Sequence, residues 1–412
     1  MNRTIFTNAR LIDPAAHGAS GNDGLSTLLI ADGRIVARDL TDLPADVQQI
    51  DANGQWLAPG IIDFGVFVTD KAAFHFGGIT RAALMPDGPP VLDNPALVER
   101  SAKGGKPDLW VHPLAAATRG LAGAELAEVG LMQRAGARGV ATGRTRIADA
   151  GVMLRLLSYA GGMGMVTTVH AEDEGLVRSA VATEGEMALR LGLPAAPAMA
   201  EAMAVARDIA LAEVAGAPIH FRQLTTARAF DLVRDAKARG LPVTCGISPA
   251  HLLLSDVALG EWRTFARLSP PLRTEDDRQA ALAALADGTI DILCSGHDPR
   301  GPEDKRLPFT DAAPGMAGAE TLLALALGLV RDGLITPARL FALLAANPAR
   351  LLGVEAGTLA AGSEADLILI SPDTPWQIDS RKMPGRAGNT PFDGLPVQGR
   401  VTAMWKGGKQ IA

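Results

Sequence analysis

The stretch LAPGIIDFGVFVTD, residues 57–70, is where the pattern of the chain changes. Upstream, residues 1–56 consist of short apolar segments separated by turns, including a favourable hairpin turn at Asp32-Gly33. From Ile61 the chain enters an apolar run that is typical of a buried strand. Downstream, similar apolar runs alternate with Ala- and Leu-rich helical segments. The stretch therefore predicts the first strand of an α/β domain.

Eight apolar runs with helical segments between them predict a (β/α)₈ barrel. The predicted strands cover residues 61–68, 79–85, 109–115, 139–142, 165–170, 218–224, 242–247 and 290–295. From about Gly357 the pattern returns to short β segments, and we expect these to pair with the N-terminal ones. The predicted organisation is a small composite β domain from residues 1–56 and 357–412, beside a barrel over residues 57–356.

Composition excludes several classes of function. The formal net charge of −6 provides no basic surface for nucleic acid or anionic membrane. Aromatic residues make up 4% of the chain, too few for base-stacking platforms. No apolar run is long enough to cross a bilayer. Two cysteines, Cys245 and Cys294, lie within predicted strands and far from any CxxC pattern, which favours buried thiols in a reducing cytoplasm.

Several stretches together resemble the amidohydrolase superfamily and, within it, the dihydroorotases, which are the cyclic-amide hydrolases of pyrimidine synthesis. They occur in order along nearly the whole chain. The stretches are APGIID (58–63), VHAED (169–173), HFRQLTT (220–226), SPPLRTEDDR (269–278), CSGHDP (294–299) and GMAGAET (315–321). The resemblance implies a zinc pair at the C-terminal ends of the strands, held by histidines and a bridging group, with an aspartate as proton shuttle.

The positions at which the family carries these groups are occupied differently here. The two histidines of the first strand correspond to Gly65 and Phe67, and the bridging ligand to Thr142 or Gly143. A further histidine corresponds to Gln223, and the catalytic aspartate to Gly296. Only His170 matches a family ligand, and one histidine does not hold a catalytic zinc. We therefore expect no catalytic residue and no metal, with Phe67 packed where a metal would sit.

The positions that bind substrate in the family are altered as well. The loop after the first strand is shortened around residues 71–76, and its carboxylate-binding arginine is absent. Asp87, Ser269 and Arg300 replace two asparagines and a histidine of the family. Together with Gly315, these residues form the expected vestige of a substrate pocket. The changes are concentrated in the functional set, whereas barrel features such as PPLR are retained.

Four other residues are candidates for relocated chemistry. Alternation along a strand places His220 and Gln223 on opposite faces, so His220 is expected on the outer face of the barrel. His251, at the start of a helix, suits packing or capping. His297 and Asp298 follow the eighth strand, where they form either a weak site with His170 or a hydrogen-bonded loop.

Three functional hypotheses follow. The first is a non-catalytic dihydroorotase homologue, because the chain resembles inactive members of that family that associate with aspartate transcarbamoylase and support its assembly. It implies an oligomeric cytoplasmic protein with no cofactor. The second is a divergent dihydroorotase or cyclic-amide hydrolase, either zinc-dependent or metal-independent. The third is a module that binds a metabolite in the barrel mouth.

Overall fold

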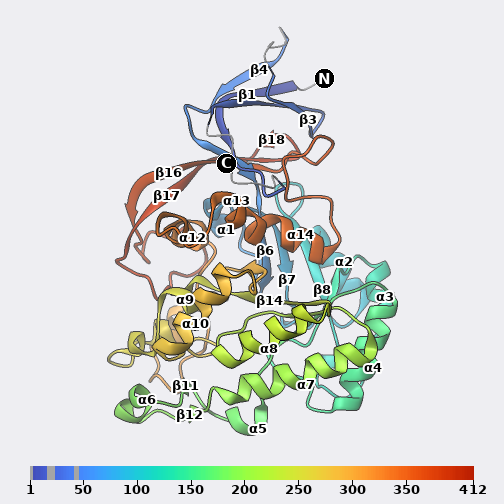
Figure 1. Cartoon of the computed structure of the whole chain (residues 1–412), viewed down its shortest axis with the longest axis vertical. Coiled ribbons are helices and arrows are strands. Elements are labelled where there is room, and N and C mark those ends of the chain that lie inside the picture. The colour runs from blue at the N-terminus through green and yellow to red at the C-terminus, as the bar shows by residue number, and fades with distance from the viewer. Residues whose placement is uncertain (1–2, 16–23, 41–45) are drawn as a thin grey trace.

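The computed structural model describes residues 3–15, 24–40 and 46–412. Figure 1 shows two parts, with a sheet that contains both chain ends above and a barrel surrounded by helices below. The predicted architecture, a (β/α)₈ barrel with a β domain from the two ends, is confirmed. The predicted domain boundaries near residues 57 and 357 stay a prediction.

The upper sheet joins strands from the first 59 residues to strands from the last 46. Its members are β1 (Arg3–Leu11), β2 (Ser26–Ala31), β3 (Arg34–Arg38), β4 (Gln48–Asp51), β5 (Trp56–Pro59), β16 (Leu367–Gln377), β17 (Pro396–Lys406) and β18 (Lys409–Gln410). The two sets meet where β5 pairs antiparallel with β16. Asp32-Gly33 links β2 to β3 with positive φ at both residues, as the predicted hairpin turn requires.

The barrel contains the eight predicted strands, most of them shorter than expected. They are β6 (Ile61–Val66), β7 (Ile79–Leu84), β8 (Trp110–Ala116), β9 (Gly139–Ala141), β10 (Thr167–Val169), β13 (Ile219–Phe221), β14 (Val243–Ile247) and β15 (Ile292–Leu293). All pair in parallel, in chain order. Parallel strands are buried on both faces, which explains why they read as continuous apolar runs.

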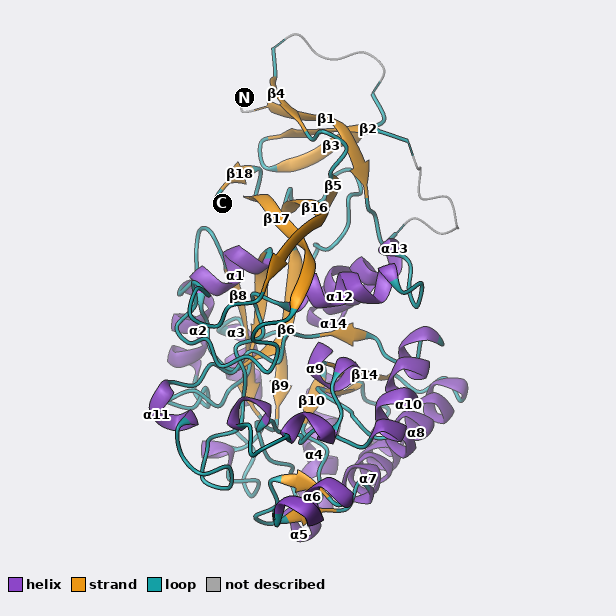
Figure 2. Ribbon diagram, turned by 90° about the vertical axis from the view of Figure 1, so that its left-hand side faces the viewer, coloured by secondary structure: helices purple, strands orange, loops and turns teal. Residues whose placement is uncertain are grey.

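Helices follow the strands and cover the barrel from outside (Figure 2). The helices are α1 (Lys71–Gly77), α2 (Pro95–Lys103), α3 (Val129–Arg134), α4 (Ala150–Gly162), α5 (Glu174–Val177), α6 (Glu186–Leu191), α7 (Met199–Ala215), α8 (Ala227–Ala238), α9 (Pro249–Leu253), α10 (Glu275–Ala286), α11 (Pro302–Lys305), α12 (Leu322–Arg331), α13 (Pro337–Phe341) and α14 (Asn347–Leu352). A short unpredicted pair, β11 (Ala182–Thr183) with β12 (Ala195–Ala196), lies beside α6.

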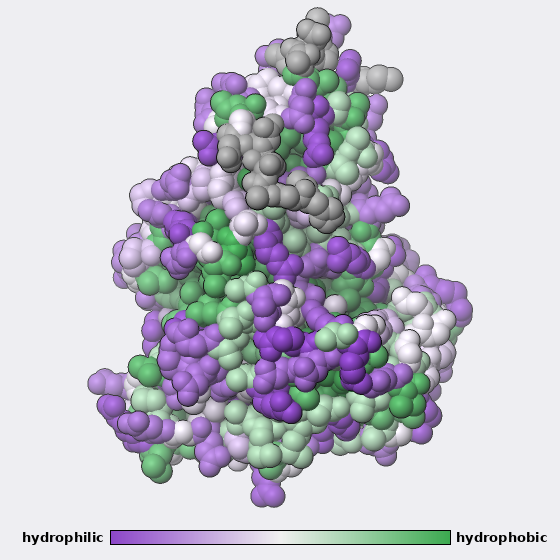
Figure 3. Space-filling model, viewed as in Figure 1, coloured by the Kyte–Doolittle hydropathy of each residue, from purple (hydrophilic) through white to green (hydrophobic). Residues whose placement is uncertain are grey.

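The surface of the protein contains both hydrophilic and hydrophobic residues. On the face shown in Figure 3, hydrophilic and hydrophobic side chains are interspersed. Among the described residues, no helix combines the length and apolarity needed to cross a membrane.

A buried carboxylate links the first barrel strand to the last. Asp63 on β6 accepts hydrogen bonds from the backbone N–H of Ser295 at 2.9 Å and from the Ser295 hydroxyl. Farther along, the N–H of Phe67 donates to the carbonyl of His297 at 3.0 Å. Burial raises the pKa of Asp63 to about 6, although both bonds from Ser295 lower it. These bonds bring β6 and the segment after β15 together and so help to close the barrel.

A second buried ionic cluster joins the barrel to the upper sheet. Arg81 on β7 donates from Nε to Asp366, next to β16, at 2.8 Å. Lys406 on β17 lies 2.8 Å from the same carboxylate. Both cations lie over the ring of Trp110, at 4.6 and 4.0 Å from its centre. Asp366 is 4% exposed, and both cations also pair with Glu364, at 2.5 and 3.4 Å, so two buried cations share one buried and one partly exposed carboxylate.

We predict that Asp366→Ala destabilises the chain, because it removes the buried carboxylate that Arg81 and Lys406 share and leaves them only the partly exposed Glu364. The expected loss is at most about 3–5 kcal/mol, the usual cost of breaking a buried ion pair outright. The matched control is Asp373→Ala, at an exposed position of β16. Urea unfolding followed by circular dichroism measures both variants. Equal unfolding midpoints would show that the cluster does not stabilise the junction.

Candidate functional site at the barrel mouth

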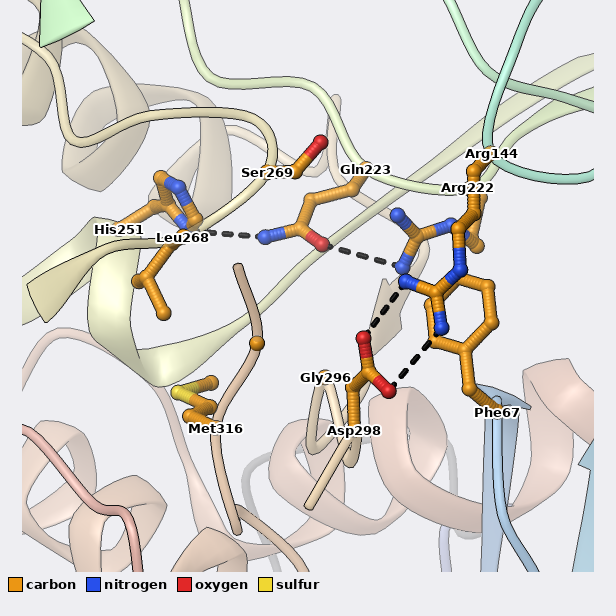
Figure 4. Close-up of a pocket in the computed structure, with 11 residues that line it drawn as sticks. Phe67, Arg144, Arg222, Gln223, His251, Leu268, Ser269, Gly296, Asp298 and Met316 are labelled. Carbon is orange, nitrogen blue, oxygen red and sulfur yellow. Dashed lines mark hydrogen bonds and ion pairs between the residues drawn. The ribbon is translucent and has the colours of Figure 1, made fainter. Parts of the chain in front are cut away.

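A pocket lies at the C-terminal end of the barrel strands, with about 320 Å³ of empty space when the open solvent at its entrance is included. Figure 4 shows that its polar groups converge from several strands and loops. The lining residues are Phe67, Arg144, Arg222, Gln223, His251, Leu268, Ser269, Gly296, Asp298, Gly315 and Met316. Active sites of (β/α)₈ barrels are built at this end of the strands.

Gly65 interrupts the first strand in a way that defines the pocket. The pairing of β6 with β7 shifts register between Phe64 and Val66, and Gly65 has a φ of +85°. A Cβ at Gly65 would lie 3.0 Å from both Cγ and Cδ of Arg222. Glycine therefore serves here both for its backbone conformation and for the space it leaves. The volume beside the first strand is filled by an arginine side chain.

The guanidinium groups of two arginines lie close to the ring of Phe67. The Cζ atoms of Arg144 and Arg222 lie 3.7 and 4.9 Å from the ring centre. Arg144 also forms a bidentate pair with Asp298, at 2.6 and 3.0 Å. Phe67 is 8% exposed, so its ring is a buried platform for cations.

The space beside Gly296, the position that the resemblance assigns to a catalytic aspartate, is also filled. Gly296 has a φ of +63°, and a Cβ there would lie 3.0 Å from Cε of Met316. A side chain at Gly296 would require both a strained backbone and movement of Met316.

Gln223 belongs to a buried amide–imidazole network. Its Nε2 donates to Nδ1 of His251 at 2.8 Å, and its Oε1 accepts from Nη1 of Arg222 at 3.2 Å. The Nε2 of His251 lies 3.1 Å from the carbonyl of Pro270. This carbonyl requires a donor, so Nε2 carries the proton and Nδ1 accepts. Burial lowers the pKa of His251 to about 4, and the ring is neutral at pH 7.

His170 is engaged elsewhere. Its Nε2 lies 3.1 Å from Glu172, and its backbone N–H donates to the hydroxyl of Thr142 at 3.1 Å. Glu172 in turn pairs with Arg273 at 2.9 Å. Burial would raise the pKa of Glu172, but the bond from His170 and the charge of Arg273 lower it to about 2. His170, which the resemblance assigns as a metal ligand, is therefore part of a buried ionic network.

This set of donors does not fit the zinc pair that the resemblance implies. Zinc sites need three or four nitrogen, sulfur or carboxylate ligands around one point. Within residues 3–15, 24–40 and 46–412, no three His, Cys, Asp or Glu side chains come close enough to hold a metal ion. Two guanidinium groups, which cannot act as ligands, lie in the mouth instead.

The candidates for relocated chemistry do not converge. Asp298 pairs with Arg144 and, at 2.9 Å, with Arg300. His297 accepts a hydrogen bond at Nδ1 from the backbone of Ala319 at 3.3 Å. The hydrogen-bonded loop is therefore the alternative that the structure supports, and not a site with His170.

The prediction for His220 was wrong. Its ring lies edge-on to Phe64, with centres 4.8 Å apart. Phe64 is on β6 and His220 on β13, which are not neighbours in the sheet, so the two rings meet across the barrel interior. Strand β13 ends at Phe221, and the alternation argument does not extend to Gln223. Burial lowers the pKa of His220 to about 3, and Thr244 binds its Nδ1 at 2.9 Å.

The remaining pocket candidates surround the arginines. Oδ1 of Asp87 accepts from the backbone N–H of Arg144 at 2.8 Å, and burial raises the pKa of Asp87. Ser269 and Gly315 line the pocket. Arg144 and Arg222 were not predicted as site residues from the sequence, although an arginine within a predicted apolar strand was an available signal for Arg222.

We predict that Gly65→Ala lowers the free energy of unfolding by more than Gly164→Ala, a control at a glycine whose added Cβ would contact no other atom. Gly164 also has a positive φ, +68°, and no atom within 4 Å of a built Cβ. Gly164→Ala should cost on the order of 1–2 kcal/mol from the backbone alone. Gly65→Ala should cost roughly 1–3 kcal/mol beyond that, because Arg222 must move. Thermal unfolding measures both. Adding Arg222→Ala to Gly65→Ala should recover the excess; an unchanged excess would contradict the contact.

Comparisons with known proteins agree with this fold. The model of the Amidohydrolase family matches residues 121–411. Dihydroorotase from Anaeromyxobacter dehalogenans (strain 2CP-C) is 38% identical, over 100% of this chain and 98% of that protein. Dihydroorotase from Pelobacter propionicus is 37% identical, over 99% of each. L-hydantoinase from Arthrobacter aurescens superposes with a TM-score of 0.88 at 24% identity, over 100% and 96% of the two chains. The chain thus belongs to the amidohydrolase family and is a homologue of the dihydroorotases.

Proposed function

We propose that this chain is a catalytically inactive dihydroorotase homologue of pyrimidine metabolism. One observation carries the proposal: the positions, other than His170, that the resemblance assigns to metal ligands and a proton shuttle are occupied by groups that can neither bind zinc nor transfer a proton. Arg222 fills the space beside Gly65, the Phe67 ring lies under two cations, and Met316 lies where a side chain at Gly296 would project. Catalysis by a bound metal hydroxide requires ligands that converge and an open coordination position.

The contacts of His170 and Gln223 also argue against restoring a metal site with a few substitutions. His170 is bound to Glu172, so recruiting it to a metal would break a buried network. Gln223 is held by His251 and Arg222, and its amide nitrogen is committed to donation. Losing one member of a set that acts together often costs nearly as much rate as losing all of it.

We further propose that the chain acts by supporting the assembly of aspartate transcarbamoylase, the preceding enzyme of the pathway. The support for this is the resemblance to inactive dihydroorotase homologues with that role, together with dihydroorotase relatives over the full length. A barrel that retains the family fold but not the family's residues at its mouth is consistent with a protein that acts through contacts of its surface with a partner.

We predict that restoring the first-strand histidines does not restore activity. Gly65→His alone would collide with Arg222, so the stringent variant is Gly65→His, Phe67→His and Arg222→Ala together. We expect it to bind some zinc and to show no ring opening of dihydroorotate above a metal-free control, because Gln223 and Gly296 supply neither a ligand nor a proton shuttle. Zinc stoichiometry and ring-opening rate are measured beside an active dihydroorotase. Zinc-dependent turnover by the unmodified chain would refute the inactive assignment.

The assembly role has its own test. Native extract is fractionated by size, and the fractions are assayed for this chain and for aspartate transcarbamoylase activity. We expect both in one large particle, and removal of the chain should reduce the size of the transcarbamoylase. Separate elution with an unchanged transcarbamoylase particle would contradict the assembly role and leave the inactive assignment standing.

A further inference from the structure

The segment that joins β16 to β17, residues 378–395, packs on the barrel, and we call it the strap. Figure 1 shows the ribbon of β16 and β17 descending from the upper sheet beside α12. Within the strap, Asn389 is 2% exposed. Its Nδ2 donates to the carbonyl of Gly315 at 3.0 Å, and its Oδ1 accepts from the backbone N–H of Arg300 at 3.0 Å. Gly315 lines the mouth and Arg300 pairs with Asp298, so the strap is bonded to the rim of the mouth.

Two carboxylates from separate parts of the barrel lie beneath the strap at Gly385. The N–H of Gly385 donates to Oε1 of Glu320 at 3.2 Å, and the N–H of Arg386 donates to Oδ2 of Asp70 at 2.6 Å. A Cβ built at Gly385 would collide with Oε1 of Glu320 and lie 3.0 Å from Oδ2 of Asp70, so the two oxygens border the same point. Asp70 and Glu320 are each 3% exposed. Two buried like charges in one place disfavour the state in which both groups are ionised.

The groups around Glu320 do not compensate its charge. In the part of the chain that the structure describes, no lysine, arginine or histidine pairs with it, and its Oε2 has no hydrogen-bond partner. The guanidinium of Arg400, which borders the same surface pocket, lies over the ring of Trp376, 4.9 Å from its centre. Burial lowers the pKa of His297, which faces Asp70, to about 4, so this ring is neutral near pH 7.

These surroundings decide when Glu320 ionises. Burial and, in addition, the charge of Asp70 raise the pKa of Glu320 to about 7, although the N–H of Gly385 lowers it. Lifting the strap lets water reach the carboxylate, so its pKa returns toward the ordinary value for a glutamic acid. Below that value both forms of the chain keep the proton. Between that value and about pH 7, the lifted form releases a proton that the docked form retains, so a rise in pH favours lifting; above this range the effect is complete.

We propose that the strap is a pH-sensitive latch on the barrel, docked over Asp70 while Glu320 is protonated and loosened when Glu320 ionises. The two carboxylates come from the barrel, and the N–H donors come from the segment between two strands of the upper sheet. Through Asn389, loosening of the strap releases the bonds to Gly315 and Arg300 at the rim of the mouth. The inference does not depend on whether the chain turns over dihydroorotate.

Hydrogen exchange of the purified full chain, followed by mass spectrometry, tests the latch. The variant Glu320→Gln resembles the protonated acid, because its amide oxygen can still accept from Gly385. Near pH 8 we expect the peptides of the strap to exchange roughly a hundredfold faster in the parent chain than in this variant. Near pH 5 the difference should shrink to a few-fold. Parent and variant are compared at the same pH, so the intrinsic exchange rates cancel.

Two further variants complete the experiment. The matched control is Glu303→Gln on α11, where the side chain is 92% exposed, and it should leave exchange of the strap unchanged at both pH values. Gly385→Ala places a Cβ against Oε1 of Glu320 and so keeps the strap from docking. Its strap peptides should exchange rapidly at both pH values, while the buried strand β10 stays protected.

Three results would overturn the inference. They are equal exchange of the strap in the parent and in Glu320→Gln near pH 8, an effect of Glu303→Gln as large as that of Glu320→Gln, and a strap in Gly385→Ala that is as protected as in the parent near pH 5. If Glu320→Gln fails to fold, the other two chains decide. Protection of the strap in the parent, corrected for intrinsic exchange, must then fall between about pH 5 and about pH 8, and in Gly385→Ala it must not. None of these results concerns zinc content or dihydroorotate turnover, so failure of the latch is distinguishable from failure of the inactive assignment.

Discussion

The contact between Gly65 and Arg222 is the constraint on which the character of this barrel depends. Because Gly65 has no Cβ, the aliphatic part of Arg222 can pack directly against the first strand. The Cβ of any other residue at this position would lie 3.0 Å from Cγ and Cδ of Arg222, closer than ordinary van der Waals contact. Once the arginine occupies this volume, its charge lies in the mouth beside Phe67 and Arg144. A cationic centre built from protein atoms then stands at the end of the barrel where relatives by fold carry out chemistry.

The other features of the mouth are consistent with that centre. Asp298 is held between Arg144 and Arg300, and Gln223 turns its oxygen to Arg222 and its nitrogen to His251. His170 is drawn into the pair with Glu172. The barrel itself is closed and anchored away from the mouth, by Asp63 with Ser295 and by Arg81 with Asp366. These contacts, which close and anchor the barrel, do not involve the residues that line the mouth.

The architecture could be predicted from the sequence because each barrel strand lies within a continuous apolar run. All eight barrel strands were located, as was the pairing of the two ends, since burial on both faces leaves a continuous signal. The interior of the mouth was harder. The orientation of His220 was mispredicted because β13 ends at Phe221, and strand length decides which face a residue takes. The contact of Arg222 with Gly65 joins residues far apart in the chain, so no local pattern reveals it.

The most direct test of the account is a crystal structure determined after growth with excess zinc, using diffraction data collected at the zinc absorption edge. The account predicts no anomalous peak in the barrel mouth, with the side chain of Arg222 packed against Gly65. An anomalous peak within bonding distance of His170, with Arg222 displaced from Gly65, would contradict it.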